Sequence, residues 1–224
     1  EGEALGSYYG YVADGYFQSQ EEIDMADCVY GGNKANIKPG YIRYVDVNHD
    51  GEINSKDRVI LGNSTPRYEY SFTLGGQWKG IDLSLFFQGV GKRDLYYSGA
   101  GARPLVQNST IFKSQLDTWS PENPDAEYPL LLVDAGSTNM NNIVSSFWIK
   151  SGAYLRLKNL TVGYTLPKKW TNRVSIDNLR LYFTASNLFT INNGYKGYEP
   201  ETGVTSGAMY PVMKTFNFGI NLDF

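Results

Sequence analysis

The sequence predicts an all-β fold, on the basis of its aromatic content, its abundance of glycine and several stretches in which apolar and polar residues alternate. The 224 residues include 18 Tyr, 11 Phe, 4 Trp and 24 Gly, and aromatic side chains are enriched in strands. Alternation with a period of two is typical of a strand that has one apolar and one polar face. The chain is long enough to bury a core as one large domain or two small ones.

Two short helices are expected outside the strands. The first should run over residues 18–25, after an apolar aromatic pair. The second should run from residue 110 to about residue 118, because Ser109 can accept a hydrogen bond from its first turn and Pro121 would stop it.

Residues 46–57 form a candidate metal-binding loop with the sequence DVNHDGEINSKD. Oxygen-bearing side chains at positions 1, 3 and 5, followed by glycine at position 6, match the template of a calcium loop. A hard cation needs about six to eight oxygen ligands, and glycine permits the sharp turn that aims them at one point. The expected ligands of a structural Ca²⁺ are Asp46, Asn48, Asp50, Glu52 through its backbone carbonyl, Asn54 and Asp57.

A metal-free loop of Asx-turns is the alternative for the same residues. The loop also resembles those of dockerin modules, which likewise carry Asp at the last position, but a dockerin has two such loops and this chain has one. His49 occupies a non-ligating position of the loop, so no catalytic role is expected for it.

About five stretches of alternating residues predict strands of roughly ten residues each. The clearest has an apolar face made of Phe216, Phe218, Ile220, Leu222 and Phe224. A hairpin through Lys79 and Gly80 joins two others, whose apolar faces comprise Tyr68, Tyr70, Phe72, Leu74 and Trp78, and Ile81, Leu83, Leu85 and Phe87. The last two stretches carry Leu160, Val162, Tyr164 and Leu166, and Leu179, Leu181, Phe183 and Ala185.

The length of these strands favours the wall of an antiparallel transmembrane β-barrel over a soluble β-sandwich, in which shorter strands are usual. Connector lengths favour the same fold, because outer-membrane barrels have short turns on one side and long loops on the other. The connections are short at residues 79–80 and 167–177, and long at residues 91–151 and 189–212. If the short turns are periplasmic, both long loops are extracellular. About five strands cannot close a barrel, so further strands are expected upstream.

Composition and residue usage argue against several function classes. A net charge of −3 without a Lys/Arg stripe argues against a nucleic-acid partner. Cys28 and His49 are the only cysteine and histidine, so the chain offers no internal disulfide, zinc cluster or hydrolytic triad, and enzyme activity is not expected. No run of about 18 apolar residues is present, which excludes a transmembrane helix but leaves a transmembrane barrel open.

Aromatic residues in the expected outer loops are candidates for stacking on sugar rings or for contact with a partner protein. The alternative is that each packs within its loop or belongs to an aromatic girdle at the membrane surface. These candidates are Tyr96, Tyr97, Trp148, Tyr195 and Tyr198.

Residues 10–23 and 39–89 resemble the C-terminal region of the SusC/RagA family of TonB-linked outer-membrane proteins. Further agreement comes, in chain order, from the motifs WSPENP (119–124), YLRLKNL (154–160), GYTLP (163–167), NLFT (187–190), YEPE (198–201) and YP (210–211). The resemblance covers nearly the whole chain.

This resemblance implies a large outer-membrane barrel of about 22 strands with a plugged lumen. It also implies a SusD-like lipoprotein on the outer face, and TonB acting through a plug upstream of this chain. Residues 67–224 would be the last strands of a transporter for glycan or peptide fragments, with outer-membrane lipid around them, and residues 1–66 an extracellular segment. The alternative is a soluble or surface glycan-binding β-sandwich or adhesin module with a structural calcium.

Overall fold

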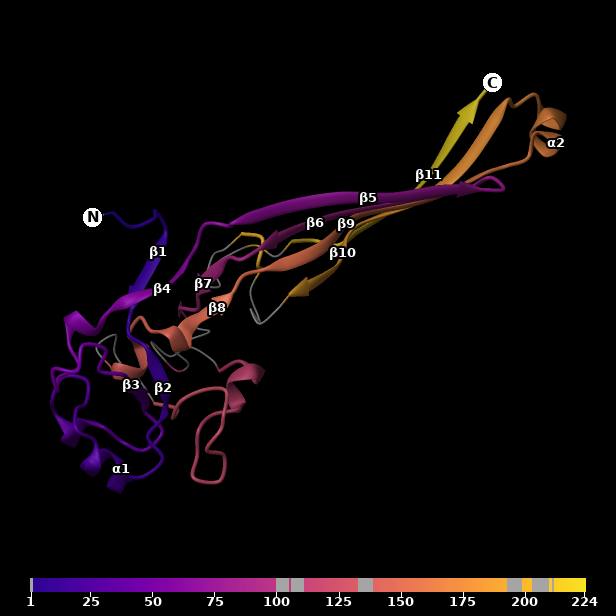
Figure 1. Cartoon of the computed structure of the whole chain (residues 1–224). Helices are drawn as coiled ribbons and strands as arrows, with labels where there is room; N and C mark the ends of the chain where they lie inside the picture. Colours follow the sequence, from indigo (N-terminus) through magenta and orange to yellow (C-terminus); the bar gives the residue numbers. More distant parts are fainter. Residues whose placement is uncertain are drawn as a thin grey trace. The chain divides into compact units, whose positions relative to one another are not determined.

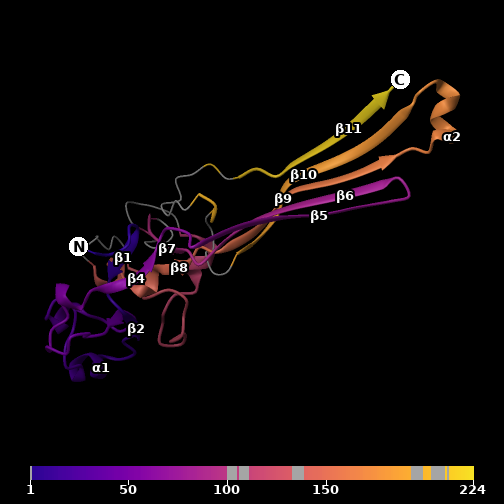
Figure 2. The same ribbon diagram turned by 45° about the horizontal axis from the view of Figure 1, so that its top comes forward.

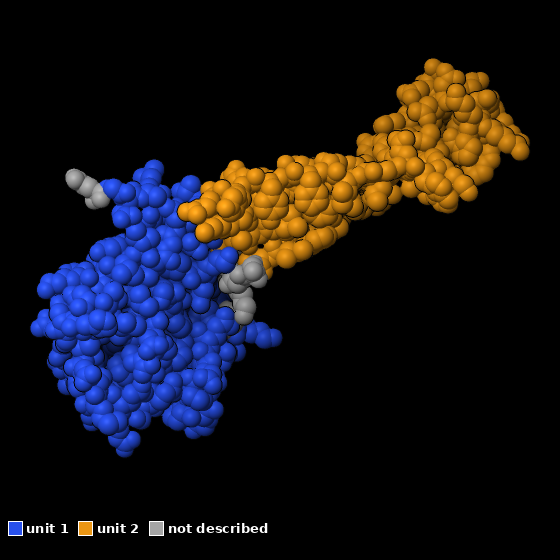
Figure 3. All heavy atoms as spheres, in the orientation of Figure 1, with its two compact units in different colours: residues 1–65, 93–151, 203–209 blue, residues 66–92, 152–202, 210–224 orange. Residues whose placement is uncertain are grey.

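A computed structural model of the chain describes residues 2–99, 105, 111–132, 139–192, 199–202, 210 and 212–224. The chain divides into two compact units, coloured blue and orange in Figure 3. Unit 1 contains residues 1–65, 93–151 and 203–209, and unit 2 contains residues 66–92, 152–202 and 210–224. Unit 1 therefore contains both the N-terminal segment and most of the first long connection.

In its described residues, unit 2 is a single antiparallel sheet of five strands, in the order β11-β10-β9-β6-β5. Each strand pairs with the next strand of the sheet along the chain, which makes an up-and-down meander (Figure 1). The strands predicted from the alternating pattern are confirmed. They are β5 Tyr68–Trp78, β6 Ile81–Gly91, β9 Tyr154–Thr165, β10 Asn178–Asn192 and β11 Thr215–Asp223.

Strand β10 is longer than expected, because residues 189–192 were predicted to belong to the following loop. Its pairing with β9 shifts register between Ser186 and Phe189, and Asn187 there has a left-handed backbone with φ of 54°. This irregularity resets the alternation, so that the strand continues with Phe189 paired to Leu157.

The register of the sheet aligns apolar residues from all five strands on one face. Directly paired residues of antiparallel strands point to the same side of a sheet. One continuous row is Ile220, Leu181, Tyr164, Ile81 and Trp78, and the next is Phe218, Phe183, Val162, Leu83 and Gly76. Many of these apolar side chains are exposed, including Phe218 at 84% and Ile220 at 63%.

Short connections lie at one end of the sheet. The β5–β6 turn has positive φ at Lys79 (48°) and Gly80 (86°), which is the backbone of a type I′ hairpin turn. The β9–β10 connection contains helix α2, Lys168–Thr171, and a 3-10 turn, Asn172–Val174. Figure 2 shows α2 and the β5–β6 hairpin at the same end of the sheet.

Unit 1 contains short strand pairs instead of one extended sheet. Strand β1 Ser7–Gly10 pairs with β4 Val59–Asn63, β2 Ala13–Tyr16 with β3 Ile42–Tyr44, and β7 Asp94–Tyr96 with β8 Ile149–Ser151. Turns of 3-10 helix lie at Lys34–Asn36, Ser55–Asp57, Lys113–Leu116, Met140–Asn142 and Ser146–Trp148.

The first predicted helix is present as α1, Gln20–Met25, where the Ser19 side chain accepts a hydrogen bond from the Glu22 N–H. The second is not an α-helix in its described part, which has only the 3-10 turn at Lys113–Leu116. Ser109 and Thr110 lie outside the described residues. The turn is closed by its own side chain, since the Phe112 N–H donates to the buried Gln115 amide oxygen at 2.8 Å.

The core of unit 1 is aromatic and joins its two main segments. Trp148 is 2% exposed, and its Nε1 donates to the Asn141 carbonyl at 2.7 Å. The Asn141 side chain in turn accepts from the Ile42 N–H at 2.8 Å, which links residues 42 and 141.

Among the described residues, no helix has the length and the apolar composition that a membrane span requires.

Candidate functional site

The polar face of the unit 2 sheet carries an ion pair between strands that are not neighbours. Arg180 on β10 donates to Asp82 on β6, from Nε to Oδ1 at 2.9 Å and from Nη2 to Oδ2 at 2.6 Å. Strand β9 runs between them, and a Cβ on its Gly163 would lie 2.4 Å from Asp82 Oδ1 and 2.5 Å from Arg180 Nη2. The absence of a side chain at this position leaves room for the pair.

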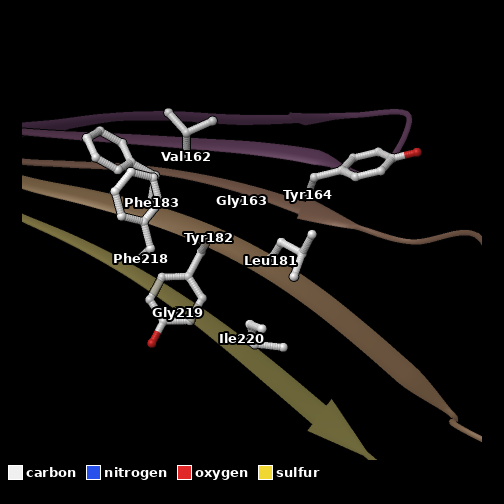
Figure 4. A pocket seen from close by; sticks show the side chains of 9 residues that line it. All are labelled: Val162, Gly163, Tyr164, Leu181, Tyr182, Phe183, Phe218, Gly219 and Ile220. Carbon is white, nitrogen blue, oxygen red and sulfur yellow. The ribbon is translucent and has the colours of Figure 1, made fainter.

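The apolar face of the same sheet has a shallow cavity of about 490 Å³ (Figure 4). Its walls are side chains of two adjacent rows, while Tyr182 projects away from this face in Figure 4. The apolar residues that line it are Val162, Tyr164, Leu181, Phe183, Phe218 and Ile220. A surface of this composition favours contact with hydrocarbon rather than with a polar ligand.

The loop at residues 46–57 adopts a series of Asx-turns. The Asp46 carboxylate accepts from the N–H groups of His49 and Gly51, each at 2.8 Å. Asn48 Oδ1 accepts from the Asp50 N–H at 3.0 Å, and Asp50 Oδ1 accepts from the Glu52 N–H at 3.1 Å. Gly51 has a φ of 84°, so glycine makes the sharp turn for which the motif requires it.

Asp57, the last residue of the motif, is fully buried and holds the loop together. Its Oδ1 accepts from the N–H groups of Val47 (3.0 Å) and Asn48 (3.3 Å), and its Oδ2 accepts from the Asn54 N–H (2.8 Å). Burial raises the pKa of Asp57, but the hydrogen bonds from the Asn54, Asn48 and Val47 N–H groups lower it, and the resulting pKa is below the usual range for Asp.

Asn54, inside the loop, and Cys28, beside it, make further contacts. Asn54 Oδ1 accepts from the Lys56 N–H at 3.0 Å, and the Glu52 carbonyl accepts from Asn54 Nδ2 at 3.5 Å. The Cys28 thiol lies 3.9 Å from Asp46 Oδ2, and its pKa is raised by burial and by the Asp46 charge. Within the described residues, no three His, Cys, Asp or Glu side chains gather closely enough to hold a metal ion. Calcium binding therefore stays a prediction.

The candidate ligand-contacting aromatics differ in their surroundings. Tyr97 and Trp148 are buried at 6% and 2% exposure, with their rings stacked at a centroid distance of 6.5 Å. This burial favours the packing role over contact with a ligand. Tyr96 is partly exposed, and its ring lies 6.4 Å from that of Tyr8. Tyr195 and Tyr198 lie outside the described residues.

A buried ion-pair cluster in unit 2 was not found from the sequence. Arg156 on β9 is 3% exposed and donates to Glu199 (2.5 Å), Glu201 (2.6 Å) and the Thr190 hydroxyl (2.7 Å). Lys158 Nζ donates to both carboxylate oxygens of Glu201, at 2.7 and 2.9 Å. The motif YEPE contains both Glu199 and Glu201. The sequence around it does not predict that these two acids pair with residues of β9.

Comparison with known proteins gives relatives over the whole chain, although no protein-family model matches it. TonB-dependent receptor P3 of Formosa agariphila is 32% identical over 243 residues, which cover 100% of this chain and 22% of the relative. TonB-dependent receptor P26 of the same organism is 27% identical and covers 100% of this chain, with 23% of its own length matched. TonB-dependent receptor SusC of Bacteroides thetaiotaomicron is 28% identical over 96% of this chain and 20% of its own length.

Solved structures agree in fold. A structure of the RagAB peptide transporter matches with a TM-score of 0.68 and 23% identity, covering 97% of this chain and 23% of that chain. The RagAB peptide importer in the 'open-open' state matches with a TM-score of 0.67 and 21% identity, covering 98% of this chain and 23% of that chain. By sequence the chain is thus similar over its whole length to TonB-dependent receptors that include SusC, and it spans between 20% and 23% of the length of the curated relatives compared above.

Proposed function

We propose that the unit 2 sheet is part of the wall of a SusC-like TonB-dependent transporter in the outer membrane. The observation that carries this proposal is the register, which aligns apolar residues from five strands on one face. The strands are 9 to 15 residues long, and a tilted strand needs about 9 to 11 residues to cross a bilayer. The apolar face then meets lipid, and the opposite face meets the lumen.

The open edges of the sheet support the same proposal. In the described residues β5 and β11 each pair with only one strand of the sheet, and a sheet edge cannot remain unpaired within hydrocarbon. Further strands of the same barrel would satisfy these edges. A β-sandwich, the alternative, requires a second sheet over the apolar face, whereas the described strands of unit 2 form one sheet.

The whole transporter would import glycan or peptide fragments, with a SusD-like lipoprotein on its outer face and TonB acting through a plug outside this chain. Support comes from the names of the relatives, which include a TonB-dependent receptor SusC and a RagAB peptide transporter. This role is transport without chemistry, so no catalytic residue is assigned. The long connections, and with them unit 1, are extracellular in this proposal because the short turns suit the periplasmic side.

The loop at residues 46–57 is proposed to hold a structural Ca²⁺ through Asp46, Asn48 and Asp50. Each of these side chains has an oxygen that accepts one backbone N–H, which leaves a lone pair for a cation. Asp57 is different, because its Oδ1 already accepts two N–H groups. The spacing of the motif supports the proposal that a cation binds there. Asp57 would hold the loop in shape rather than act as a main ligand.

Cysteine labelling tests the proposed wall. In the full-length protein, with Cys28 replaced by Ser, single cysteines would be placed at Ile220 and at Asn221, which lie on opposite faces of β11. A water-soluble maleimide applied to isolated outer membranes should label position 221 through the aqueous lumen and leave position 220 unlabelled. Equal labelling of both positions would contradict the proposal.

A further inference from the structure

The two short connections of unit 2 together form a basic, aromatic end of the sheet. The Thr165 N–H donates to the Gly80 carbonyl at 2.7 Å, so the β5–β6 turn adjoins the segment that leads into α2. Figure 1 shows α2 beside the tip of this hairpin. We call residues 78–80 and 166–177, which lie at the same end of the sheet (Figure 2), the turn end.

Four cations lie on the turn end, and all are exposed: Lys79, Lys168, Lys169 and Arg173. Within the described part of the chain, none of the four forms an ion pair with a carboxylate. The described acids at this end are Asp177 and Asp223, and the Asp223 carboxylate accepts from Asn178 Nδ2 at 3.0 Å. The turn end thus has an excess of positive charge, although the whole chain has a net charge of −3.

Two exposed tryptophans accompany these cations. Trp78 is 69% exposed and Trp170 is 58% exposed. Trp78 pairs with Ile81 and thereby continues the apolar face to its last row, and Lys79 Nζ lies 4.6 Å from the centre of its ring. Tryptophan prefers the boundary between hydrocarbon and headgroups, and lysine extends from that boundary toward polar groups.

We propose that the turn end binds the phosphates of anionic phospholipids. The inference rests on the proposed function, in which the adjoining apolar face contacts lipid. The occupant follows from two features: Trp78 at this end continues the lipid-facing face, and the excess of positive charge complements a negatively charged headgroup. Zwitterionic lipid would be bound less, because it carries no net charge for the cations to attract.

Native mass spectrometry of the full-length transporter tests this inference. The protein, purified in detergent, would be titrated with phosphatidylglycerol or with phosphatidylcholine, and bound lipids would be counted. A combined variant replaces the four cations by glutamine: Lys79→Gln, Lys168→Gln, Lys169→Gln and Arg173→Gln. Its affinity for phosphatidylglycerol should fall by at least about tenfold, since each cation adds attraction to an anionic surface. Its binding of phosphatidylcholine should not change.

Two further variants separate charge from folding. Lys92 and Lys214 are exposed in the same unit at the opposite end of the sheet, so Lys92→Gln with Lys214→Gln should keep normal phosphatidylglycerol binding. Exchanging the three turn-end lysines for arginine should also keep it. Undiminished phosphatidylglycerol binding by the four-residue variant would overturn the inference, as would an equal loss of both lipids. A wild-type protein that does not insert into the outer membrane would instead contradict the proposed function.

Discussion

Arg180 and Asp82 form an ion pair with two hydrogen bonds, at 2.9 and 2.6 Å, that crosses an intervening strand. The pair fits because β9 has Gly163 at the crossing point. A bidentate arginine–carboxylate pair fixes orientation as well as distance. The pair therefore connects β6 and β10 on the polar face independently of the backbone ladder.

Gly163→Ala should destabilise the sheet, because the added Cβ would lie within 2.5 Å of atoms of both partners. The two side-chain ends would have to move apart, and the weakened ion pair, whose members are 25% and 20% exposed, should cost about 1 kcal/mol. Gly76→Ala is the matched control, since a Cβ there meets nothing within 4 Å. Urea unfolding of the full-length protein in detergent would measure both, and equal midpoints would contradict the geometry.

Arg156→Met should also destabilise unit 2, because it leaves Glu199 and Glu201 without their buried cation. Loss of one member of a buried ion pair costs about 3–5 kcal/mol. We expect less, about 2–3 kcal/mol, because Glu201 retains Lys158 and both carboxylates are partly exposed.

The control for Arg156 is Arg43→Met in unit 1. Arg43 pairs with Asp14 and Glu22, but its side chain is 38% exposed, so its loss should cost less than about 1 kcal/mol. Urea unfolding again gives the comparison. A similar loss of free energy of unfolding in the two variants would show that the Arg156 ion pairs stabilise the protein no more than exposed ion pairs do.

The loop at residues 46–57 should become less stable in acid because of Asp57. Its pKa is lowered in the folded state, so its contribution is complete above the unfolded pKa, about 3.9, and is lost as the pH falls through the lower folded value. Hydrogen exchange of the Val47, Asn48 and Asn54 N–H groups at several pH values measures this loss.

Asp57→Asn removes the charge that titrates, so it should abolish this acid dependence. At neutral pH the variant should cost about 1–3 kcal/mol, because the amide group replaces one acceptor oxygen and leaves a buried N–H unpaired. Protection that falls equally with pH in the variant and in the wild type would assign the transition to another group.

Calcium should bind to this loop with a dissociation constant on the order of 10⁻⁴ to 10⁻³ M, the range typical of extracellular calcium modules. Calorimetry of the full-length protein with Ca²⁺ measures it. Asp46→Asn and Asp50→Asn should each weaken binding, whereas Asp24→Asn, an exposed acid outside the loop, should have no effect. Absence of any binding heat at millimolar Ca²⁺ would leave the Asx-turns as the complete account of the motif.

The strands of unit 2 were predictable because each carries its own signal. Alternation in Phe216 to Phe224 predicts the two faces of β11 without reference to any other strand. The bulge at Asn187 was not predictable, because it depends on pairing with β9 and has no local pattern. The alternation also does not predict the order of the strands in the sheet, and this order places Arg180 on β10 near Asp82 on β6.

Unit 1 was less predictable, because its order comes from contacts between distant segments. The ring of Trp148 packs against those of Tyr97, Phe147 and Tyr128. The Ile42 N–H donates a hydrogen bond to the side chain of Asn141, which is 99 residues away in the sequence. Short strands and 3-10 turns have no period long enough to detect. The spacing of the oxygen-bearing residues predicts the calcium motif. It does not predict that the Asp57 carboxylate accepts hydrogen bonds from three backbone N–H groups, which the structure shows.

The assignment of the two faces is the central claim, and β11 tests it most directly. Ile220 and Asn221 are adjacent residues whose side chains point to opposite faces. In the full-length protein folded into vesicles, Ile220→Arg should lower the free energy of unfolding by about 2–4 kcal/mol, the cost of a cation facing lipid near mid-bilayer. Asn221→Arg should cost much less, because its side chain would face the aqueous lumen. Equal losses for the two variants would show that β11 does not separate lipid from water.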